Sequence, residues 1–230
     1  MTLRVGILGI DGSGKSTLVA GLERELATSC SVMSIGQRVT LHPRGGERLD
    51  LLGALPEAAH PLRHSLRNMQ RHWIMQRLPG LLKQYRPDIC LEDRDSVIDL
   101  CALVTAHLPA LRYLTPCRRV TIFSALTRRR LADMYLYLRL PAAVAAARIQ
   151  GKLQQTRRLR AFHERPHLLE RVAREYPRFL HYLAEIGVPT VVLPADQPAQ
   201  FVLEAACLSI RQHYQRKQVA AGDVSGRRHH

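Results

Sequence analysis

The 230-residue sequence is poor in aromatic side chains, paired cysteines and long apolar segments. Aromatic residues make up 5% of the chain, and few lie among its arginines, so a base-stacking nucleic-acid surface is poorly supported. The five cysteines form no C-x-x-C pair, as is typical of thiols in a reducing cytosol. No apolar run approaches the roughly 20 residues of a membrane span, and no signal-peptide pattern opens the chain. We therefore expect a cytoplasmic protein without a membrane partner.

Several catalytic motifs are also missing. The sequence has no H-E-x-x-H or G-x-S-x-G pattern and no N-K-x-D after a strand. Acidic residues are few, with 19 Asp and Glu against 34 Lys and Arg, which gives a formal net charge of +15. That charge suits either nucleic-acid binding or a phosphate-handling site in an arginine-rich protein. The scarcity of interleaved aromatics argues against nucleic acid as the main substrate.

A glycine-rich loop stands out, with the sequence Gly9-Ile10-Asp11-Gly12-Ser13-Gly14-Lys15-Ser16-Thr17, which fits G-x-x-x-x-G-K-[ST]. The apolar run at residues 3–8 predicts a buried strand before it, and residues 18–26 are apolar at helical spacing after it. This order of strand, loop and helix is typical of a phosphate-binding P-loop. Its glycines let successive N–H groups point at phosphate oxygens, and the helix N-terminus adds partial positive charge.

The residue types predict roles within this loop. The expected ATP-binding residues are Gly9, Gly12, Ser13, Gly14, Lys15, Ser16 and Thr17. Lys15 is expected to reach the β- and γ-phosphates, and the Ser16 hydroxyl to hold Mg²⁺. Asp11 is expected on the acceptor side, where it binds a hydroxyl or acts as a base. The predicted cofactors are ATP and Mg²⁺.

Strand and helix patterns alternate along the chain and predict an α/β fold, with a parallel sheet and helices on both faces. Five strands are expected, at residues 3–8, 30–35, 88–92, 134–140 and 190–193. The segment from Gly36 to about Pro56 is expected to be irregular, because Pro43 and a Gly-Gly pair interrupt it. Helices are expected over most of 57–85, over 97–130 with proline breaks, and over 142–149, 167–186 and 197–218. Residues 1–218 would form one domain and 219–230 a flexible tail.

A charged segment, Asp93-Arg94-Asp95, ends the third predicted strand. Ligands bind at the carboxyl ends of the strands in such sheets. Asp93 could hold Mg²⁺ directly or through water there, and Arg94 could neutralise phosphate. The alternative is a surface Asp–Arg pair that caps the next helix at Ser96.

A basic, polar stretch at about residues 151–165 lies between two helical patterns. One interpretation is a lid that folds over ATP and supplies Arg148, Arg157 or Arg158 to the transferring phosphoryl group. The other interpretation is a solvated basic helix face.

These elements together resemble the thymidylate kinases, within the P-loop nucleoside monophosphate kinases. Residues 10–17 are close to the family's loop, and Asp93-Arg94 stands where the family carries an Asp-Arg motif. Residues 136–141 and 171–176 resemble the strand before the lid and the helix after it. The resemblance covers most of residues 3–210. It implies a three-layer P-loop kinase fold with a parallel five-stranded sheet, helices on both faces and a basic lid.

The resemblance also implies an acceptor site. Arg44 lies in a segment that matches the family's acceptor loop in altered order, and Arg71 matches the arginine that binds the acceptor phosphate within one residue of spacing. The expected substrate-binding residues are Asp11, Arg44, Arg71, Asp93 and Arg94. The expected catalytic residues are Lys15, Asp11, Arg94, Arg148, Arg157 and Arg158. The expected metal ligands are Ser16 and Asp93.

The family's base-reading residues have no clear counterpart. Its glutamine that reads thymine falls near Asp99 and apolar neighbours, and its stacking aromatic falls near Arg67. The phosphate machinery is kept and the base reader is lost, unless Gln70 or Gln76 reads the base instead.

The sequence thus predicts an ATP- and Mg²⁺-dependent phosphotransferase. Its acceptor would be a nucleoside monophosphate, or a related small phosphorylated or hydroxyl-bearing molecule, and not dTMP itself. Two alternatives stay open: a nucleotide-binding regulatory protein without turnover, and a nucleic-acid end kinase that would use the +15 charge. The oligomeric state is open as well, with a homodimer as one option.

Overall fold

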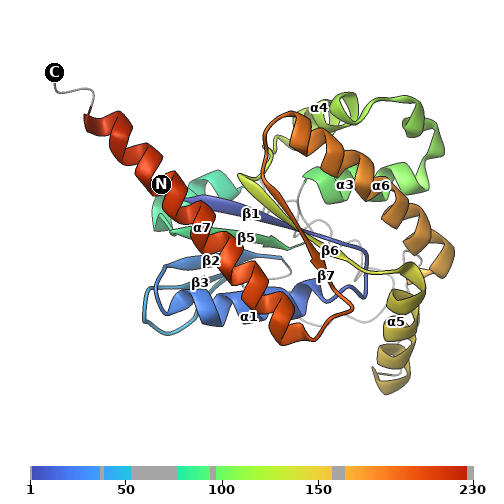
Figure 1. The fold of residues 1–230 in the computed structure, drawn as a ribbon, viewed down its shortest axis with the longest axis horizontal. Coiled ribbons are helices and arrows are strands. Elements are labelled where there is room, and N and C mark those ends of the chain that lie inside the picture. Colours follow the sequence, from blue (N-terminus) through green and yellow to red (C-terminus); the bar gives the residue numbers. More distant parts are fainter. Residues whose placement is uncertain (1, 37–38, 53–76, 94–96, 157–163, 227–230) are drawn as a thin grey trace.

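The computed structural model describes residues 2–36, 39–52, 77–93, 97–156 and 164–226. In this part of the chain, seven strands form one sheet in the order β4-β3-β2-β5-β1-β6-β7 (Figure 1). The strands are β1 (Leu3–Leu8), β2 (Val32–Ile35), β3 (Val39–His42), β4 (Leu49–Leu52), β5 (Ile89–Asp93), β6 (Met134–Arg139) and β7 (Thr190–Pro194).

The five predicted strands are present and lie next to one another as the parallel part of the sheet, β2-β5-β1-β6-β7. The residues of β1, β2, β5 and β6 are mostly apolar and buried, as expected for parallel strands covered on both faces, whereas in β7, the last strand of the sheet, only Leu193 is buried.

The prediction of a purely parallel, five-stranded sheet is wrong, because β3 and β4 extend it antiparallel to β2 and to each other. Both strands lie in the segment predicted to be irregular. Val39-Thr40-Leu41 alternates apolar and polar residues, a pattern that is typical of a strand. Pro43 and the glycines after it form the turn between the two strands, so those signals mark a hairpin connection and no long loop.

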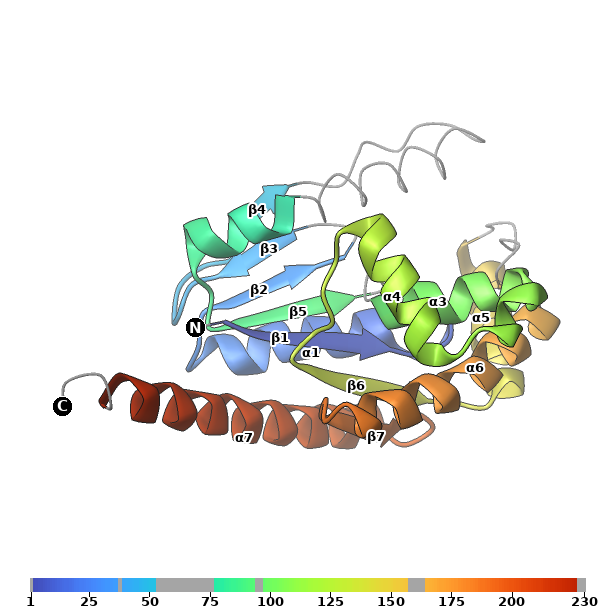
Figure 2. The same cartoon turned by 90° about the horizontal axis from the view of Figure 1, so that it is seen from above.

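The described helices match most of the predicted ones. They are α1 (Lys15–Ala27), α3 (Val97–His107), α4 (Pro116–Thr127), α5 (Ala142–Thr156), α6 (Pro166–Glu185) and α7 (Ala199–Gly226), with a 3₁₀ segment at Pro109–Tyr113 and a helical segment at 77–85. Helix α1 packs against α7, where Gly21 leaves room for the Leu203 side chain. Helices α3, α4 and α6 contact one another and gather at one end of the sheet in both views (Figures 1 and 2).

The faces of β2 show how the layers are built. Ser34 points at Glu23 of α1, whereas Met33 and Ile35 pack with Leu78 of the helical segment 77–85 on the opposite face. Period-two alternation along the strand therefore separates a polar contact with α1 from an apolar cluster on the other side.

The last helix is longer than predicted, because α7 runs to Gly226 and not to about residue 218. Its C-terminal end projects beyond the sheet (Figures 1 and 2). Its residues lack apolar periodicity there, but lysine, glutamine and alanine are good helix formers. Among the described residues, no helix is long and apolar enough to cross a membrane.

Candidate functional site

The glycine-rich loop, residues 9–17, lies at the carboxyl end of β1 and leads into α1. Gly9, Gly12 and Gly14 have φ angles of 149°, 82° and 95°, a backbone region that side chains with a Cβ rarely adopt. The loop is also packed from outside. A Cβ on Gly9 would lie 2.7 Å from Ser13 Oγ, and one on Gly12 would lie 2.8 Å from the Ala145 carbonyl oxygen of α5. Conformation and crowding therefore both require glycine at these two positions.

Lys15 lies in the loop with only 5% of its surface exposed. Its Nζ donates to the carbonyl oxygens of Gly9 and Ile10, the latter at 3.1 Å. No carboxylate is within ion-pair distance of this ammonium among the described residues, so its charge is uncompensated by an acidic partner there. A buried cation beside the N-terminus of α1 makes the loop attractive to anions.

Ser16 and Asp93 meet beside the loop. The Ser16 hydroxyl donates to Asp93 Oδ2 at 3.1 Å, and β1 and β5 pair so that Asp93 stands opposite Ile7. Asp93 Oδ1 is buried and has no hydrogen-bond partner among the residues that the structure describes. A carboxylate with one free oxygen next to a hydroxyl offers the hard oxygen donors that Mg²⁺ prefers.

The oxygen atoms of Ser16 and Asp93 suit Mg²⁺ better than a metal ion that takes all its ligands from the protein. The described residues contain no group of three or more His, Cys, Asp or Glu side chains placed to share an ion. Mg²⁺ commonly uses one or two protein oxygens, with water and substrate phosphates as its other ligands. Ser16 and Asp93 would be sufficient for that arrangement.

Ser13 carries a second unused polar atom of the loop. Its side chain is 3% exposed, and its Oγ has no hydrogen-bond partner within the described part of the chain. An unsatisfied buried hydroxyl costs free energy unless a ligand or water provides a partner. The loop therefore has hydrogen-bonding capacity that the protein itself does not use.

Helix α5 flanks the loop. Ala145 and Ile149 contact it at Gly12, and Arg148 Nη2 donates to the Ala195 carbonyl oxygen at 3.0 Å, which ties α5 to the segment after β7. The predicted lid begins inside this helix, since α5 continues to Thr156. Arg148 thus lies beside the loop, on a helix and not on a separate lid segment.

The structure places Arg44 far from the glycine-rich loop. The hairpin reverses the chain, so His42 pairs with Val32 at the start of β2, and the Gly45 N–H donates to the Ala27 carbonyl oxygen at 3.0 Å. Ala27 is the last residue of α1, whereas the glycine-rich loop precedes its first residue. The 13 residues of α1 span about 20 Å, so Arg44 lies near the amino ends of the parallel strands, whereas the loop lies at their carboxyl ends.

The other predicted site residues divide into two groups. Asp11 is half-buried within the loop, and Thr17 is exposed in the first turn of α1. Arg71, Arg94, Arg157 and Arg158 lie outside the described residues, as do Arg67, Gln70 and Gln76. The structure therefore brings together Lys15, Ser16 and Asp93, with Arg148 nearby.

Sequence reasoning missed Tyr176 of α6. Its hydroxyl lies 3.0 Å from the Gly9 carbonyl oxygen and 2.6 Å from Asp99 Oδ1 of α3, and its ring packs on Tyr137 at a centroid distance of 5.0 Å. Burial, and then the neighbouring Asp99 carboxylate, raise the pKa of Tyr176 well above its ordinary value, so the hydroxyl stays protonated. No local signal could have found it, because it lies 167 residues from Gly9 in an ordinary amphipathic helix.

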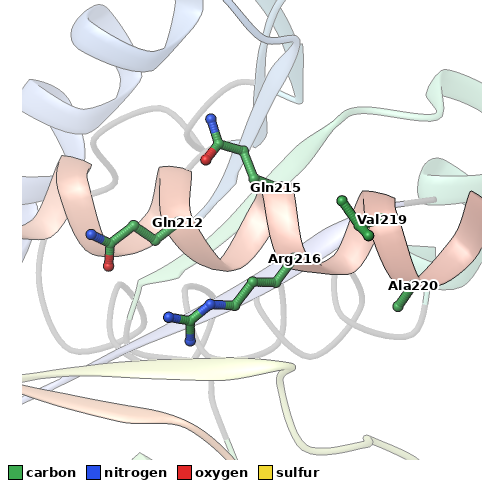
Figure 3. Close-up of a pocket in the computed structure, with 5 residues that line it drawn as sticks. All are labelled: Gln212, Gln215, Arg216, Val219 and Ala220. Carbon is green, nitrogen blue, oxygen red and sulfur yellow. The ribbon is translucent and has the colours of Figure 1, made fainter.

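A hollow of about 460 Å³ lies elsewhere, on α7 (Figure 3). It is lined by Gln212, Gln215, Arg216, Val219 and Ala220, whose side chains stand out from the exposed half of the helix. This hollow is open to solvent and offers a single cation and no nucleophile. The glycine-rich loop is therefore the better candidate site.

No protein-family model and no curated protein sequence matches this chain. Solved structures do match it. A deoxyadenosine kinase from M. mycoides with bound dATP is 16% identical, over 91% of this chain and 100% of that chain, with a TM-score of 0.56. The same enzyme with the products dCMP and a flexible dCDP bound is 15% identical over the same shares, with a TM-score of 0.55.

The chain has the fold of a nucleoside kinase. At these identities the likeness concerns the fold alone, and it does not single out the thymidylate kinases. The closer resemblance to that family therefore stays a prediction from the sequence.

Proposed function

We propose that this protein is an ATP- and Mg²⁺-dependent phosphotransferase that moves the γ-phosphoryl group of ATP to a nucleoside or nucleoside monophosphate, or to a related small acceptor. One observation carries the proposal: buried Lys15 lies in a loop whose three glycines hold left-handed conformations at the start of α1. Together these features supply a cation, inward N–H groups and a helix terminus for phosphate oxygens.

The loop residues would bind and orient the phosphates. Lys15 would leave the carbonyl oxygens of Gly9 and Ile10 to contact the β- and γ-phosphates, and the unused Ser13 hydroxyl would gain a partner. Phosphoryl transfer needs little covalent help from the protein, so positioning and charge neutralisation account for most of the catalysis.

Ser16 and Asp93 would hold the metal ion. When bound, Mg²⁺ would neutralise developing charge on the β- and γ-phosphate oxygens. The contribution of the chain is to keep the Ser16 hydroxyl and the Asp93 carboxylate 3.1 Å apart, with Asp93 Oδ1 buried and available. Lys15 and the metal would both neutralise charge on the bound phosphates.

The acceptor side of the proposal rests mainly on the sequence. Asp11 would bind an acceptor hydroxyl or act as a base, and Arg71 and Arg94 would bind an acceptor phosphate. Arg148, Arg157 and Arg158 would neutralise the transition state. The matched solved structures contain nucleotides, which supports a nucleoside or nucleotide acceptor.

Thymine recognition is not expected. The position that matches the family's thymine-reading glutamine falls near Asp99, a 9% exposed side chain that accepts the Tyr176 hydroxyl. A site that lacks its hydrogen-bonding reader discriminates weakly for that base. We therefore expect kcat/KM for dTMP below about 10⁴ M⁻¹s⁻¹, the lower end of the range for true substrates.

The test is a coupled assay of ADP formation over a panel of nucleosides, nucleoside monophosphates, sugars and oligonucleotides. We expect turnover with a member of the nucleoside or nucleotide group, and loss of at least about 100-fold in Lys15→Ala, the scale of removing one transition-state contact. Lys83→Ala, which changes an exposed lysine of the helical segment 77–85, is the matched control. ATP binding without turnover on any acceptor would favour a regulatory protein, and turnover on oligonucleotides alone would favour an end kinase.

A further inference from the structure

The carbonyl oxygen of Gly9 is the point where two donors from distant parts of the chain meet. Lys15 Nζ donates to it from within the loop, and the Tyr176 hydroxyl reaches it from α6 at 3.0 Å. Both side chains are buried, with 5% of Lys15 and 2% of Tyr176 exposed, and Gly9 is buried too. A carbonyl oxygen has two lone pairs and can accept both donors at once.

The Tyr176 hydroxyl has one proton but two acceptors within reach. Asp99 Oδ1 lies at 2.6 Å, closer than the Gly9 oxygen. While Lys15 donates to Gly9, the carboxylate is the stronger acceptor for the Tyr176 proton. The hydroxyl can change acceptor by rotating about its C–O bond, without any movement of the ring.

Helix α6 holds the ring in place. Glu175, the preceding residue, accepts from Arg119 Nη1 at 2.9 Å and from Arg112 Nε at 2.8 Å, and both Arg119 and Glu175 are almost completely buried. Arg119 also lies over the Phe179 ring, 4.7 Å from its centroid. Removing one partner of a buried ion pair is strongly destabilising, so this contact holds α6 in place and fixes the position of Tyr176 beside the loop.

We infer that Tyr176 is a positioning residue of the phosphate loop: its hydroxyl becomes the donor to the Gly9 carbonyl when Lys15 moves to the nucleotide phosphates. This inference rests on the proposed function, which requires that movement of Lys15. Without Tyr176, nucleotide binding would leave a buried carbonyl oxygen with no donor, which carries a free-energy cost. With it, the loop keeps its shape in both positions of the lysine.

The experiment measures ATP binding in the presence of Mg²⁺ by titration calorimetry, with thermal unfolding as a separate readout. Tyr176→Phe removes only the hydroxyl, and we expect about tenfold weaker ATP binding, or about 1.4 kcal/mol. Tyr214→Phe is the matched control, because it removes a hydroxyl that donates to Asp88 Oδ1 at 2.7 Å, at the other edge of the sheet. It should bind ATP within about twofold of the parent. AMP lacks the β- and γ-phosphates, so its binding should be equal in Tyr176→Phe and the parent.

A second variant keeps the inference testable if Tyr176→Phe unfolds. Asp99→Asn weakens the competing acceptor for the Tyr176 proton, so ATP should bind as tightly as to the parent, or more tightly. Threefold weaker binding in Asp99→Asn, or unchanged ATP binding in a folded Tyr176→Phe, would overturn the inference and leave the proposed function intact. Absence of ATP binding in the parent protein would overturn both.

Discussion

The parallel sheet has an amino edge, where its strands begin, and a carboxyl edge, where its strands end. Carboxylate side chains are used differently at these two edges. At the amino edge, both oxygens of Asp88 are occupied, one by the Ser31 N–H and one by the Tyr214 hydroxyl, and Asp133 Oδ2 accepts from the Arg4 N–H and from Lys217. At the carboxyl edge, Asp93 Oδ1 is buried and has no hydrogen-bond partner in the part of the chain that the structure describes. The amino edge is satisfied by the protein alone, whereas the carboxyl edge has capacity for a ligand.

The contrast is sharpest between two neighbours on β5. Glu92 is 2% exposed and pairs with Arg4 at 2.7 Å, a contact that joins β5 to β1. Asp93, the next residue, points to the other face, and among the described residues its side chain hydrogen-bonds only to Ser16. Alternation along one strand thus separates a structural carboxylate from a candidate metal ligand.

The largest expected effect is the loss of turnover when the carboxylate at the carboxyl edge is removed. Asp93→Asn should lower turnover by about 100-fold or more, since it weakens the ligand for an ion that stabilises the transition state by several kcal/mol. Its melting temperature should stay close to that of the parent, because the lost charge forms no ion pair with any of the described residues. Steady-state kinetics at several Mg²⁺ concentrations, with thermal unfolding, would check this. A change in stability with unchanged turnover would contradict the assignment of Asp93.

The neighbouring substitution should give the opposite result. Glu92→Gln leaves Arg4 without its charged partner and should lower the free energy of unfolding by about 2 kcal/mol. Turnover per folded molecule should stay within about threefold of the parent. Chemical denaturation and kinetics on the same preparation would test this pair of outcomes. Loss of turnover without loss of stability would mean that Glu92 takes part in the chemistry.

Two glycine substitutions, one at each edge, compare how the backbone of the two edges affects ATP binding. Gly12→Ala combines a φ of 82° with a Cβ 2.8 Å from the Ala145 carbonyl oxygen, and should weaken ATP binding about tenfold. Gly45→Ala, with a φ of 64° and open space around it, should cost only about 1 kcal/mol of stability. Calorimetric titration with ATP would compare them. Equal ATP affinities in both variants would contradict the phosphate-binding role of the loop.

The smallest expected effect concerns pH at the amino edge. Partial burial, followed by the hydrogen bond to Asp88, raises the pKa of Tyr214 to about 12. The folded protein therefore favours the neutral phenol, and this stabilisation is complete below about pH 10 and is lost as the pH rises towards 12. Unfolding midpoints measured from pH 8 to 12 should show the advantage of the parent over Tyr214→Phe shrinking across that range. A constant difference would contradict this account of Tyr214.

Much of the fold could be predicted because its signals are local. The glycine-rich loop, its flanking strand and helix, and the four other parallel strands each have a pattern within a few residues. The sequence does not predict the β3–β4 hairpin, because each of its strands has only four residues and the turn residues Pro43 and Gly45 lie between them. The pattern of the whole segment therefore indicates a loop. The same hairpin displaced Arg44, since reversal of the chain carries it to the amino edge of the sheet.

The site could be predicted only where its residues are close in sequence or end a clear strand. Lys15 and Ser16 belong to one motif, and Asp93 ends β5, so strand topology alone brings them together. Tyr176 could not be predicted, because its position beside Gly9 depends on how α6 packs against α3. Contacts of that kind come from tertiary packing and leave no mark on local sequence.

The central claim is that the carboxyl edge binds nucleotide phosphates through Lys15. Its most direct test is calorimetric titration of the parent and of Lys15→Ala with ATP in the presence of Mg²⁺, beside Lys83→Ala as a surface control. The account predicts saturable one-site binding by the parent and the control, and binding at least about tenfold weaker in Lys15→Ala, which is about 1.4 kcal/mol. Equal affinities in all three proteins, or no binding by the folded parent, would contradict it.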